Sequence, residues 1–204
     1  MMKRSLYALV SLGVILSLLF VGHIMAQEKE EKAPPELRQY VGAKKCKPCH
    51  ISVKKGKQYK IWKASKHAQS YEVLASDKAR EVAKSLNVED PQKSPQCLTC
   101  HVTGYGLKAE AYGPKYLKED GITCEACHGA GGDYWKPKVM KQIWQGKLDP
   151  AEVGLIKPSE EVCMKCHDKE RVPAAVYKEF KFEERVKSIA HPYPEELKKP
   201  VELK

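Results

Sequence analysis

Hydrophobic residues follow helical spacing in several short stretches of this chain, and no stretch shows the alternation of a β-strand. Between residues 54 and 74, aromatic residues and alanines recur among lysines, which predicts one helix or two short ones. Residues 77–86 predict a further helix that begins with an acidic residue. Residues 174–190 predict a last helix, which Pro192 prevents from continuing. The pattern therefore predicts a mostly α fold with little regular sheet.

Capping residues and glycines mark the ends of these segments. Ser159 stands before two glutamates, the arrangement of an N-cap followed by an acidic first turn, so a helix that carries the next residues is predicted to begin there. Residues 102–106 and 129–132 are rich in glycine. Glycine either lets the backbone pass close to a flat cofactor or permits an ordinary turn, and the sequence pattern favours neither.

The chain begins with the features of a secretory signal. Lys3 and Arg4 precede an apolar run that ends near Val21, and Ala26 supplies the small residue expected before a cleavage site. The alternative is an uncleaved membrane anchor over residues 5–26, which is long enough to span a bilayer when tilted. Both interpretations place the rest of the chain outside the cytoplasm, in the periplasm or the extracellular space.

Three segments are predicted along the chain. They are a signal peptide over residues 1–26, a mobile leader over residues 27–40, and one domain over residues 41–204. The leader is predicted from its charge and its two adjacent prolines. The remainder has the length of a single domain.

The strongest chemical signal is the sequence Cys-x-x-Cys-His, which occurs four times and uses all eight cysteines. It is the attachment motif of c-type haem, in which two thiols bond the porphyrin and the adjacent histidine is the proximal iron ligand. We therefore expect four covalently bound haem c groups, which would themselves form the apolar core. The predicted cofactor-binding residues are Cys46, Cys49, His50, Cys97, Cys100, His101, Cys124, Cys127, His128, Cys163, Cys166 and His167.

Zinc is the competing interpretation, because four Cys-x-x-Cys pairs would suffice for two four-cysteine sites. Such sites do not require the histidine that follows every pair in this chain. They are also mostly intracellular, whereas this chain begins with an export signal. Disulfide bonds would leave the four histidines unexplained. Haem attachment therefore remains the prediction.

The net charge of +10, from 36 basic and 26 acidic residues, raises the question of a nucleic-acid partner. The lysines are interpreted as scattered along the sequence rather than gathered in one tract, and haem propionates would offset much of the charge. No nucleic acid is therefore predicted. A basic surface suits encounter with an acidic redox partner protein. Asp120 and Glu125, near the third motif, are expected to be solvated.

Histidine is too scarce to give every haem two histidine ligands. Outside the predicted signal, four of the six histidines belong to the motifs, which leaves His67 and His191 as candidate distal ligands. An electron-transfer haem normally has two strong axial ligands, so at least two irons lack a distal histidine from their own chain. A histidine of another subunit or an open coordination position would account for the gap. So would four side chains of this chain, namely Met140, Met164, Lys136 and Lys138.

Stretches beyond the motifs resemble the tetrahaem cytochrome c-554 family, over residues from about 41 to 191. They comprise the Gly-x-x-Lys-Cys that opens the first motif, Trp62 five residues before His67, and the Val-Thr-Gly-Tyr-Gly that follows the second motif. They also include the glycines on both sides of the third motif and the Phe-Lys-Phe that precedes His191. The resemblance implies a mostly helical fold with the haems in closely stacked pairs.

The resemblance also implies ligands for individual irons. It pairs distal with proximal histidines as His67 with His167 and His191 with His128. The iron above His101 would be open. The family places a further histidine shortly after the third motif, as the distal ligand of the first haem, and residues 133–140 of this chain contain none. The sixth ligand of the His50 haem is therefore left open as well.

These features favour an exported electron carrier between redox partner proteins. In the family the donor is an oxidoreductase such as hydroxylamine oxidoreductase, and the acceptors are downstream cytochromes. One alternative is the reduction of nitric oxide or another nitrogen oxide at an open iron above His101, which leaves enzymatic activity uncertain. Such a reaction consumes protons, and no donor stands out in the sequence. The other alternative is an oligomer or an extracellular haem filament, in which one subunit lends a histidine to the next.

Overall fold

The chain divides into two units, residues 1–33 and 34–204. The computed structural model describes residues 38–191, all of which lie in the second unit. The predicted signal peptide over residues 1–26 therefore lies outside the described residues, as does most of the predicted leader. Within the described range, no helix combines the length and the apolar character needed to cross a membrane.

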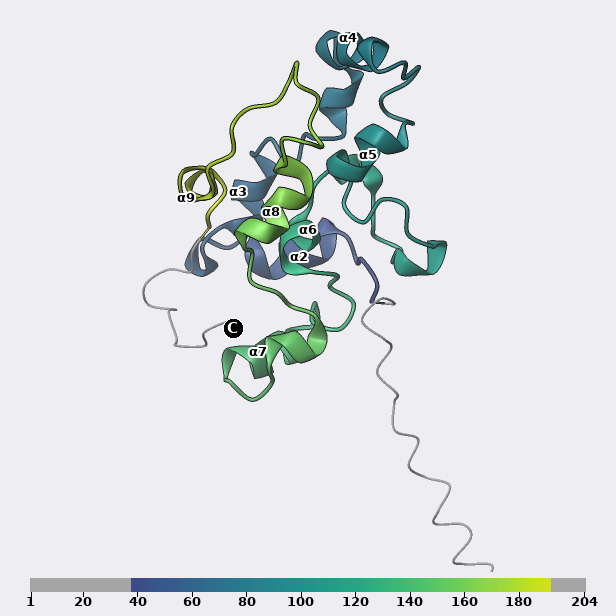
Figure 1. Ribbon diagram of the computed structural model, residues 1–204. Helices are drawn as coiled ribbons and strands as arrows, with labels where there is room; N and C mark the ends of the chain where they lie inside the picture. The colour runs from purple at the N-terminus through teal and green to yellow at the C-terminus, as the bar shows by residue number, and fades with distance from the viewer. Residues whose placement is uncertain (1–37, 192–204) are drawn as a thin grey trace, which may run out of the picture. The chain divides into compact units, whose positions relative to one another are not determined.

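Short helices joined by turns make up the second unit (Figure 1), and residues 38–191 contain no β-strand. One isolated bridge joins Tyr40 to Tyr112. This confirms the predicted mostly α fold. The α-helices are α2 (Ala43–His50), α3 (Gln58–Lys63), α4 (Asp77–Ser85), α5 (Pro95–His101), α6 (Cys124–His128), α7 (Pro137–Trp144), α8 (Glu160–His167) and α9 (Phe182–Arg185). Shorter 3-10 turns are η3 (Val53–Lys55), η4 (Glu72–Ala75), η5 (Ala109–Ala111), η6 (Lys118–Asp120), η7 (Pro150–Val153) and η8 (Val186–Ser188).

Capping residues begin two of the predicted helices, although only the Ser159 cap was itself predicted. Ser76 accepts a hydrogen bond from the Ala79 amide at the start of α4. Ser159 accepts one from the Val162 amide at the start of α8, and this helix carries the fourth motif. In both helices a side-chain oxygen satisfies an amide that has no partner within the helix. The Ser159 cap thus predicted the start of α8, and the acidic first residue predicted the start of α4.

Residues 54–74 were expected to form one helix or two short ones, and they form the short helix α3 between the 3-10 turns η3 and η4. Gly56 and Lys57 both adopt left-handed backbone conformations, with φ of 97° and 57°, and they separate η3 from α3. The chain then forms turns before η4. A left-handed residue ends a right-handed helix, so the regular spacing of apolar residues did not produce one continuous element.

The predicted last helix over residues 174–190 is wrong. The structure has only α9 and η8 there, preceded by an irregular stretch. No residue between 174 and 191 is fully buried, and Val176 is 41% exposed. Most of the stability of a short helix comes from packing an apolar face. The apolar residues of this segment are at most partly buried, so the helical pattern is realised over only one or two turns.

Helix α7 was not predicted, although its sequence carries signals for it. Pro137 occupies the first turn, where its missing amide costs nothing. Val139, Met140 and Ile143 then lie on one face, and they pack against Tyr134 and Val153. This apolar cluster holds α7 against the turn η7.

The protein interior between the helices is small. Three clusters, each with three fully buried residues, make up the hydrophobic core of the described range. The first contains Trp62 and contacts Cys124, and the second contains Leu98 and contacts Cys97. Apolar burial is therefore concentrated beside cysteines of the motifs rather than in one central layer.

Glu125 lies inside the third motif and is only 2% exposed, which corrects the expectation that it is solvated. Its Oε1 accepts hydrogen bonds from the amides of Val41 at 2.7 Å and Gly131 at 2.8 Å. Its Oε2 accepts one from Gly42 at 2.8 Å. Burial raises the pKa of Glu125, and the three amide donors act in the opposite direction. One carboxylate thus joins α6 to the start of α2 and to the turn that follows the third motif.

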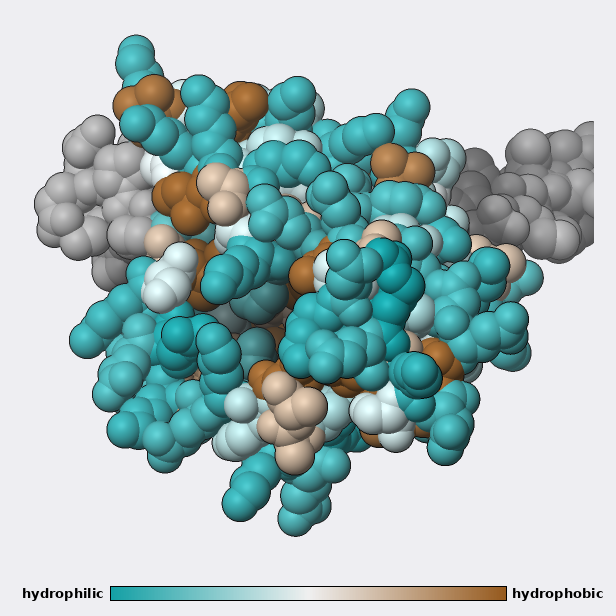
Figure 2. All heavy atoms as spheres, turned by 90° about the horizontal axis from the view of Figure 1, so that it is seen from above, coloured by the Kyte–Doolittle hydropathy of each residue, from teal (hydrophilic) through white to brown (hydrophobic). Residues whose placement is uncertain are grey.

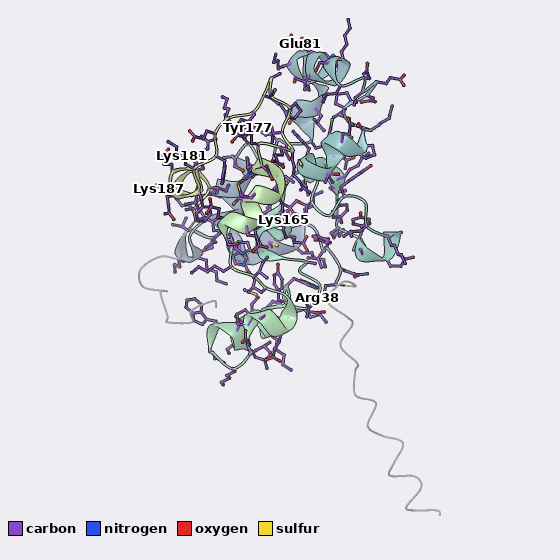
Figure 3. All side chains as sticks on the ribbon, in the orientation of Figure 1. Arg38, Glu81, Lys165, Tyr177, Lys181 and Lys187 are labelled. Atoms are coloured by element: carbon purple, nitrogen blue, oxygen red, sulfur yellow. The ribbon has the colours of Figure 1, made fainter. Side chains whose placement is uncertain are left out.

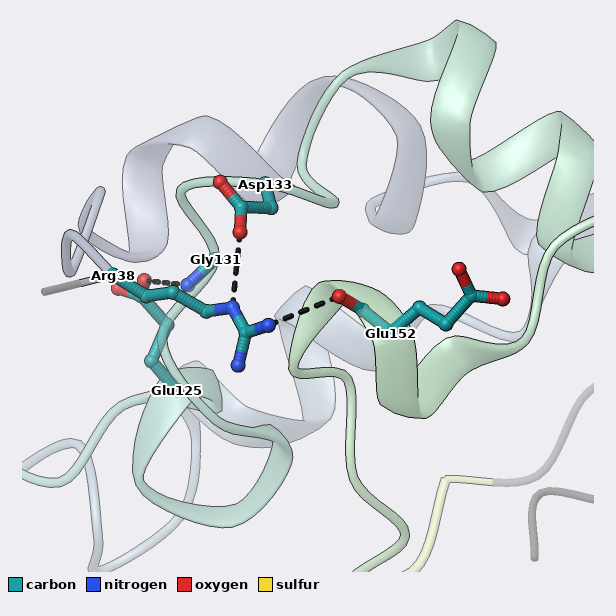
Figure 4. A network of polar contacts seen from close by, with 5 residues as sticks. All are labelled: Arg38, Glu125, Gly131, Asp133 and Glu152. Atoms are coloured by element: carbon teal, nitrogen blue, oxygen red, sulfur yellow. Dashed lines mark hydrogen bonds and ion pairs between the residues drawn. The ribbon is translucent and has the colours of Figure 1, made fainter. Parts of the chain in front are cut away.

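Arg38 adds a second link in the same region (Figure 4). Its guanidinium donates to Asp133 Oδ2 at 2.9 Å and to the carbonyl of Glu152 at 2.9 Å. The Arg38 side chain is mostly buried, with 13% of it exposed. Residues 38–42 are therefore fastened to three later segments of the chain.

Gly42 shows why this junction tolerates no side chain. Its φ is 86°, and a Cβ atom there would lie 2.2 Å from the carbonyl oxygen of Lys115. The glycines after the third motif meet backbone in the same way, since a Cβ at Gly129 would lie 2.3 Å from the Gly154 carbonyl oxygen. In the described residues these glycines allow close approach of protein backbone to protein backbone.

Replacing Glu125 with alanine should destabilise the protein more than replacing it with glutamine. Glutamine keeps one oxygen, which can still accept from Val41 and Gly131, and only the Gly42 amide loses its acceptor. Alanine leaves all three buried amides without an acceptor, at about 1–3 kcal/mol each. The free energy of unfolding, from guanidinium titrations followed by far-UV circular dichroism, should fall in the order wild type, Glu125→Gln, Glu125→Ala.

Glu81→Ala is the matched control, because the Glu81 side chain is exposed on α4 (Figure 3) and pairs only with the exposed Lys78. Its free energy of unfolding should stay close to that of the wild type, since exposed ion pairs contribute little. Equal losses for the alanine variants at positions 81 and 125 would contradict the role assigned to Glu125.

Candidate haem-binding sites

Each Cys-x-x-Cys-His motif occupies the C-terminal end of a short α-helix, and the histidine is the last helical residue in all four. The helices are α2, α5, α6 and α8. Residues at positions i, i+3 and i+4 of a helix lie on one face. Both thiols and the imidazole of a motif therefore point to the same side, as attachment to a single porphyrin requires. All eight cysteines are partly exposed and none forms a disulfide.

The four motif helices come together as two pairs. Helix α2 contacts α6, and α5 contacts α8. In the first pair the Cys46 thiol donates a hydrogen bond to Cys124, which lowers the pKa of Cys124. In the second pair the Cys166 thiol donates to Cys100 and lowers its pKa to about 7. The first motif thus adjoins the third, and the second adjoins the fourth.

The turn that carries His67 is fixed by hydrogen bonds from two later segments. The Ile122 amide donates to the His67 carbonyl at 3.0 Å, and the Trp62 indole donates to the Ile122 carbonyl at 2.8 Å. The Ser70 hydroxyl donates to the His101 carbonyl at 3.0 Å. These bonds hold residues 67–70 between the second and third motifs, and the position of the His67 side chain follows from them.

Both histidines outside the motifs lie opposite a motif histidine. The ring centres of His67 and His167 are 6.1 Å apart, with 64° between the ring planes. Those of His128 and His191 are 5.9 Å apart, with an angle of 44°. Metal–nitrogen bonds of about 2 Å place the centres of two imidazoles on opposite sides of one metal ion about 6 Å apart. Both pairs therefore have the separation that a shared axial metal ion would require.

Backbone carbonyls orient two of the motif imidazoles. His101 Nδ1 lies 2.6 Å from the Ser70 carbonyl oxygen, and His128 Nδ1 lies 3.3 Å from that of Ile156. A carbonyl accepts only from a protonated nitrogen, so these contacts favour the tautomer with a free Nε2. The Nε2 atom is then available for a metal. In the fourth motif, Phe180 stacks on the His167 ring at 4.6 Å and 17°, which fixes its plane.

Burial favours the neutral form of several of these imidazoles. Desolvation lowers the pKa of His50, His67, His128 and His167. A metal binds imidazole only in its neutral form. The environment of these rings is therefore suited to binding a metal. In the His67–His167 pair, both imidazoles are favoured in the neutral form.

The first and second motifs have no such histidine partner among residues 38–191, where no ring contact joins His50 or His101 to another histidine. Of the candidate side chains, Lys136 and Lys138 are exposed. Met140 packs in the apolar cluster of α7, and Met164 is half-buried in α8. Across the same described range, no group of three or more His, Cys, Asp or Glu side chains is arranged to hold a metal ion without a cofactor.

Sequence reasoning missed the residues that position the histidines. Ser70 contacts His101 through its hydroxyl and its carbonyl, and the Tyr134 hydroxyl donates to the Gly129 carbonyl at 2.6 Å, directly after His128. Neither residue belongs to a motif. The partner of Ser70 lies 31 residues away along the chain, and Tyr134 reaches back five residues to Gly129. No sequence pattern marks either residue for this role.

Comparison with known proteins agrees with this arrangement. A family model described as "Cytochrome c554 and c-prime" matches residues 45–129, which hold the first three motifs. The protein called cytochrome c-554 from Nitrosomonas europaea is 33% identical over 141 residues, which cover 63% of this chain and 57% of the relative. The match thus spans little more than half of the relative's length. No solved structure matches the chain. Through residues 45–129, the chain is similar to the cytochrome c-554 family.

Proposed function

We propose that this protein is an exported tetrahaem c-type cytochrome that carries electrons between redox partner proteins. Similarity to the cytochrome c-554 family supports a c-type cytochrome, a class of electron carrier with covalently bound haem. The finer assignment concerns the number of haems, their ligands and the location of the protein. The observation that carries it is the placement of all four motifs at helix ends, with two further histidines opposite motif histidines.

The residues of the chain divide into three roles in this proposal. The eight cysteines fix the cofactors covalently, and the motif histidines bind from one side. His191 binds from the other side of the third site, and His67 from the other side of the fourth. When bound, each haem supplies an iron that accepts and releases one electron at a potential set by its ligands and burial. No side chain is required to act as an acid or a base.

The pairing of motif helices supports a route through the protein. The thiols of Cys46 and Cys124 are in contact, as are those of Cys100 and Cys166. Cofactors attached at these positions would lie beside each other, the first with the third and the second with the fourth. We propose these as the two stacked pairs. Export to the periplasm through the signal over residues 1–26 provides the compartment in which c-type haem is attached.

A second candidate function is reduction of nitric oxide or a related nitrogen oxide at the second site. It is favoured by one observation, that His101 is oriented by Ser70 and has no histidine opposite it among residues 38–191. An iron with a vacant position binds small molecules directly.

Loss of one motif should remove one haem. A Cys97→Ser/Cys100→Ser double variant should retain three quarters of the haem per chain found in the wild type, because each motif attaches its own group. Equivalent pairs of substitutions in the other three motifs should give the same ratio. Haem is measured by the pyridine haemochrome assay and the attached mass by intact mass spectrometry. A wild-type chain with fewer than four haems would contradict the tetrahaem assignment.

Loss of His67 should convert one haem from low spin to high spin. His67→Ala removes the imidazole opposite His167 and leaves that iron with one strong ligand. Electron paramagnetic resonance of the ferric protein should show a new high-spin signal. His191→Ala should do the same at the His128 site, and Lys66→Ala, an exposed neighbour, should leave the spectrum unchanged. An unaltered spectrum for His67→Ala would remove it from the ligand set.

Carbon monoxide should bind to the reduced protein at the second site. The Cys97→Ser/Cys100→Ser variant should therefore bind less of the gas than the wild type, whereas a Cys163→Ser/Cys166→Ser variant should not, because His67 closes the fourth site. Optical difference spectra give the amount bound. If the wild type binds no carbon monoxide, the nitrogen-oxide function is excluded and electron transfer stands alone.

A further inference from the structure

The net positive charge of the described chain comes from one segment. Residues 38–66 contain ten basic residues and no acidic residue, whereas residues 67–191 contain 19 basic and 19 acidic residues. The entire net charge of the described range therefore belongs to its first 29 residues. This corrects the interpretation of the lysines as scattered. Lysines do occur throughout the chain, but in residues 38–66 no acidic residue of the same segment balances their charge.

The lysines of this segment are directed to solvent. Eight of the nine lysines between residues 44 and 66 are exposed, and Lys45 is half-buried against the Trp135 ring at 4.1 Å. Ion pairs of lysines in the described range involve Lys78, Lys93 and Lys181, all outside this segment. Among residues 38–191, the segment thus presents positive charge that no ion pair with an acidic side chain neutralises.

The charged segment is also a compact structural piece. It comprises α2, η3 and α3, and α2 packs against α3. His50 ends α2, so the first motif lies within the segment. Val53 follows three residues later and is 64% exposed, the highest value among the exposed large hydrophobic residues of the described range. Lys54 and Lys55 stand directly beside it in η3.

An exposed apolar residue surrounded by side chains of like charge is typical of a transient protein interface. Interfaces combine an apolar centre with a polar rim, and complementary charge accelerates encounter. The face of the molecule in Figure 2 gives the contrast, because hydrophilic residues cover most of it and hydrophobic residues form small separate patches. Exposed apolar area is thus scarce on that face. In the charged segment, the exposed large hydrophobic residue Val53 lies beside lysines and close to the first motif.

We propose that residues 44–66 form the docking face for an acidic redox protein, so that electrons pass through the haem of the first motif. This rests on the proposed function as an electron carrier. The lysines would surround the contact and Val53 would lie near its centre. The partner is defined by chemistry, as a protein with an acidic patch around its own redox centre.

Reduced plant-type ferredoxin is a suitable probe, because it is acidic and its low reduction potential makes it a strong donor. Ferredoxin loses one electron and the ferric cytochrome gains it, which stopped-flow absorbance follows at the haem bands. The rate constant with the wild type should fall as ionic strength rises, because salt screens opposite charges.

Two triple variants of equal charge separate a docking face from net charge alone. The first is Lys44→Glu/Lys54→Glu/Lys60→Glu, within the segment. The second is Lys84→Glu/Lys108→Glu/Lys141→Glu, at exposed positions elsewhere. At low salt the first variant should react about 10-fold more slowly than the wild type or worse, the lower end of electrostatic steering. The second should stay within about 2-fold of the wild type, and haem content and spin state should be unchanged in both.

The outcomes distinguish the proposals. If both variants slow equally, net charge alone sets the rate and the docking face is wrong. If neither slows, the segment takes no part. If the wild type accepts no electron from ferredoxin but is reduced by dithionite, the carrier function fails before docking is tested. Sedimentation with vesicles of phosphatidylserine and phosphatidylcholine supplies the last comparison. Vesicle binding lost in the first variant, with an unchanged ferredoxin rate, would assign the segment to a membrane surface instead.

Discussion

A single buried carboxylate organises the described part of this protein. Glu125 accepts hydrogen bonds from the amides of Val41 and Gly42, just before α2, and from the amide of Gly131 in the turn after its own motif. In a protein with an extensive apolar core such a bond would be one of many contributions. Here the core is three small clusters, so a fixed polar junction determines how the first and third motifs are placed. The adjacent glycines and the Arg38 contacts are consequences of the same close packing.

The scarcity of apolar packing is consistent with a chain that folds around its cofactors. Four porphyrins would bring far more apolar area than the side chains supply, and burial of that area is the main favourable term in folding. The polypeptide then has to supply turns, caps and hydrogen bonds rather than a dense interior. This division explains why the helices are short and why four of the eight α-helices in residues 38–191 end where a Cys-x-x-Cys-His motif ends.

Local signals predicted the elements that depend on local chemistry. The motifs, the Ser159 cap and the helix over residues 77–86 were all readable from neighbouring residues. The partners of His67 and His191 were not, because they lie about 100 and 63 residues away along the chain, and only the resemblance to a family suggested them. Glu125 could not be recognised from its neighbours either, since a glutamate inside a Cys-x-x-Cys-His motif gives no sign of hydrogen bonds from the amides of residues 41 and 42. The helix expected over residues 174–190 failed because spacing alone does not supply a surface to pack against.

The turn at residues 67–70 has a role in two sites at once. It carries the imidazole opposite His167, and its Ser70 carbonyl lies against His101. The irons of the second and fourth sites, on α5 and α8, would thus both depend on residues 67–70. The fourth would be bound by His67, and the second by His101, which the Ser70 carbonyl orients. Displacement of that turn would alter the coordination of one iron and the basicity of the imidazole at the other. The pair would then respond to a change in ligation as one mechanical unit rather than as two independent centres.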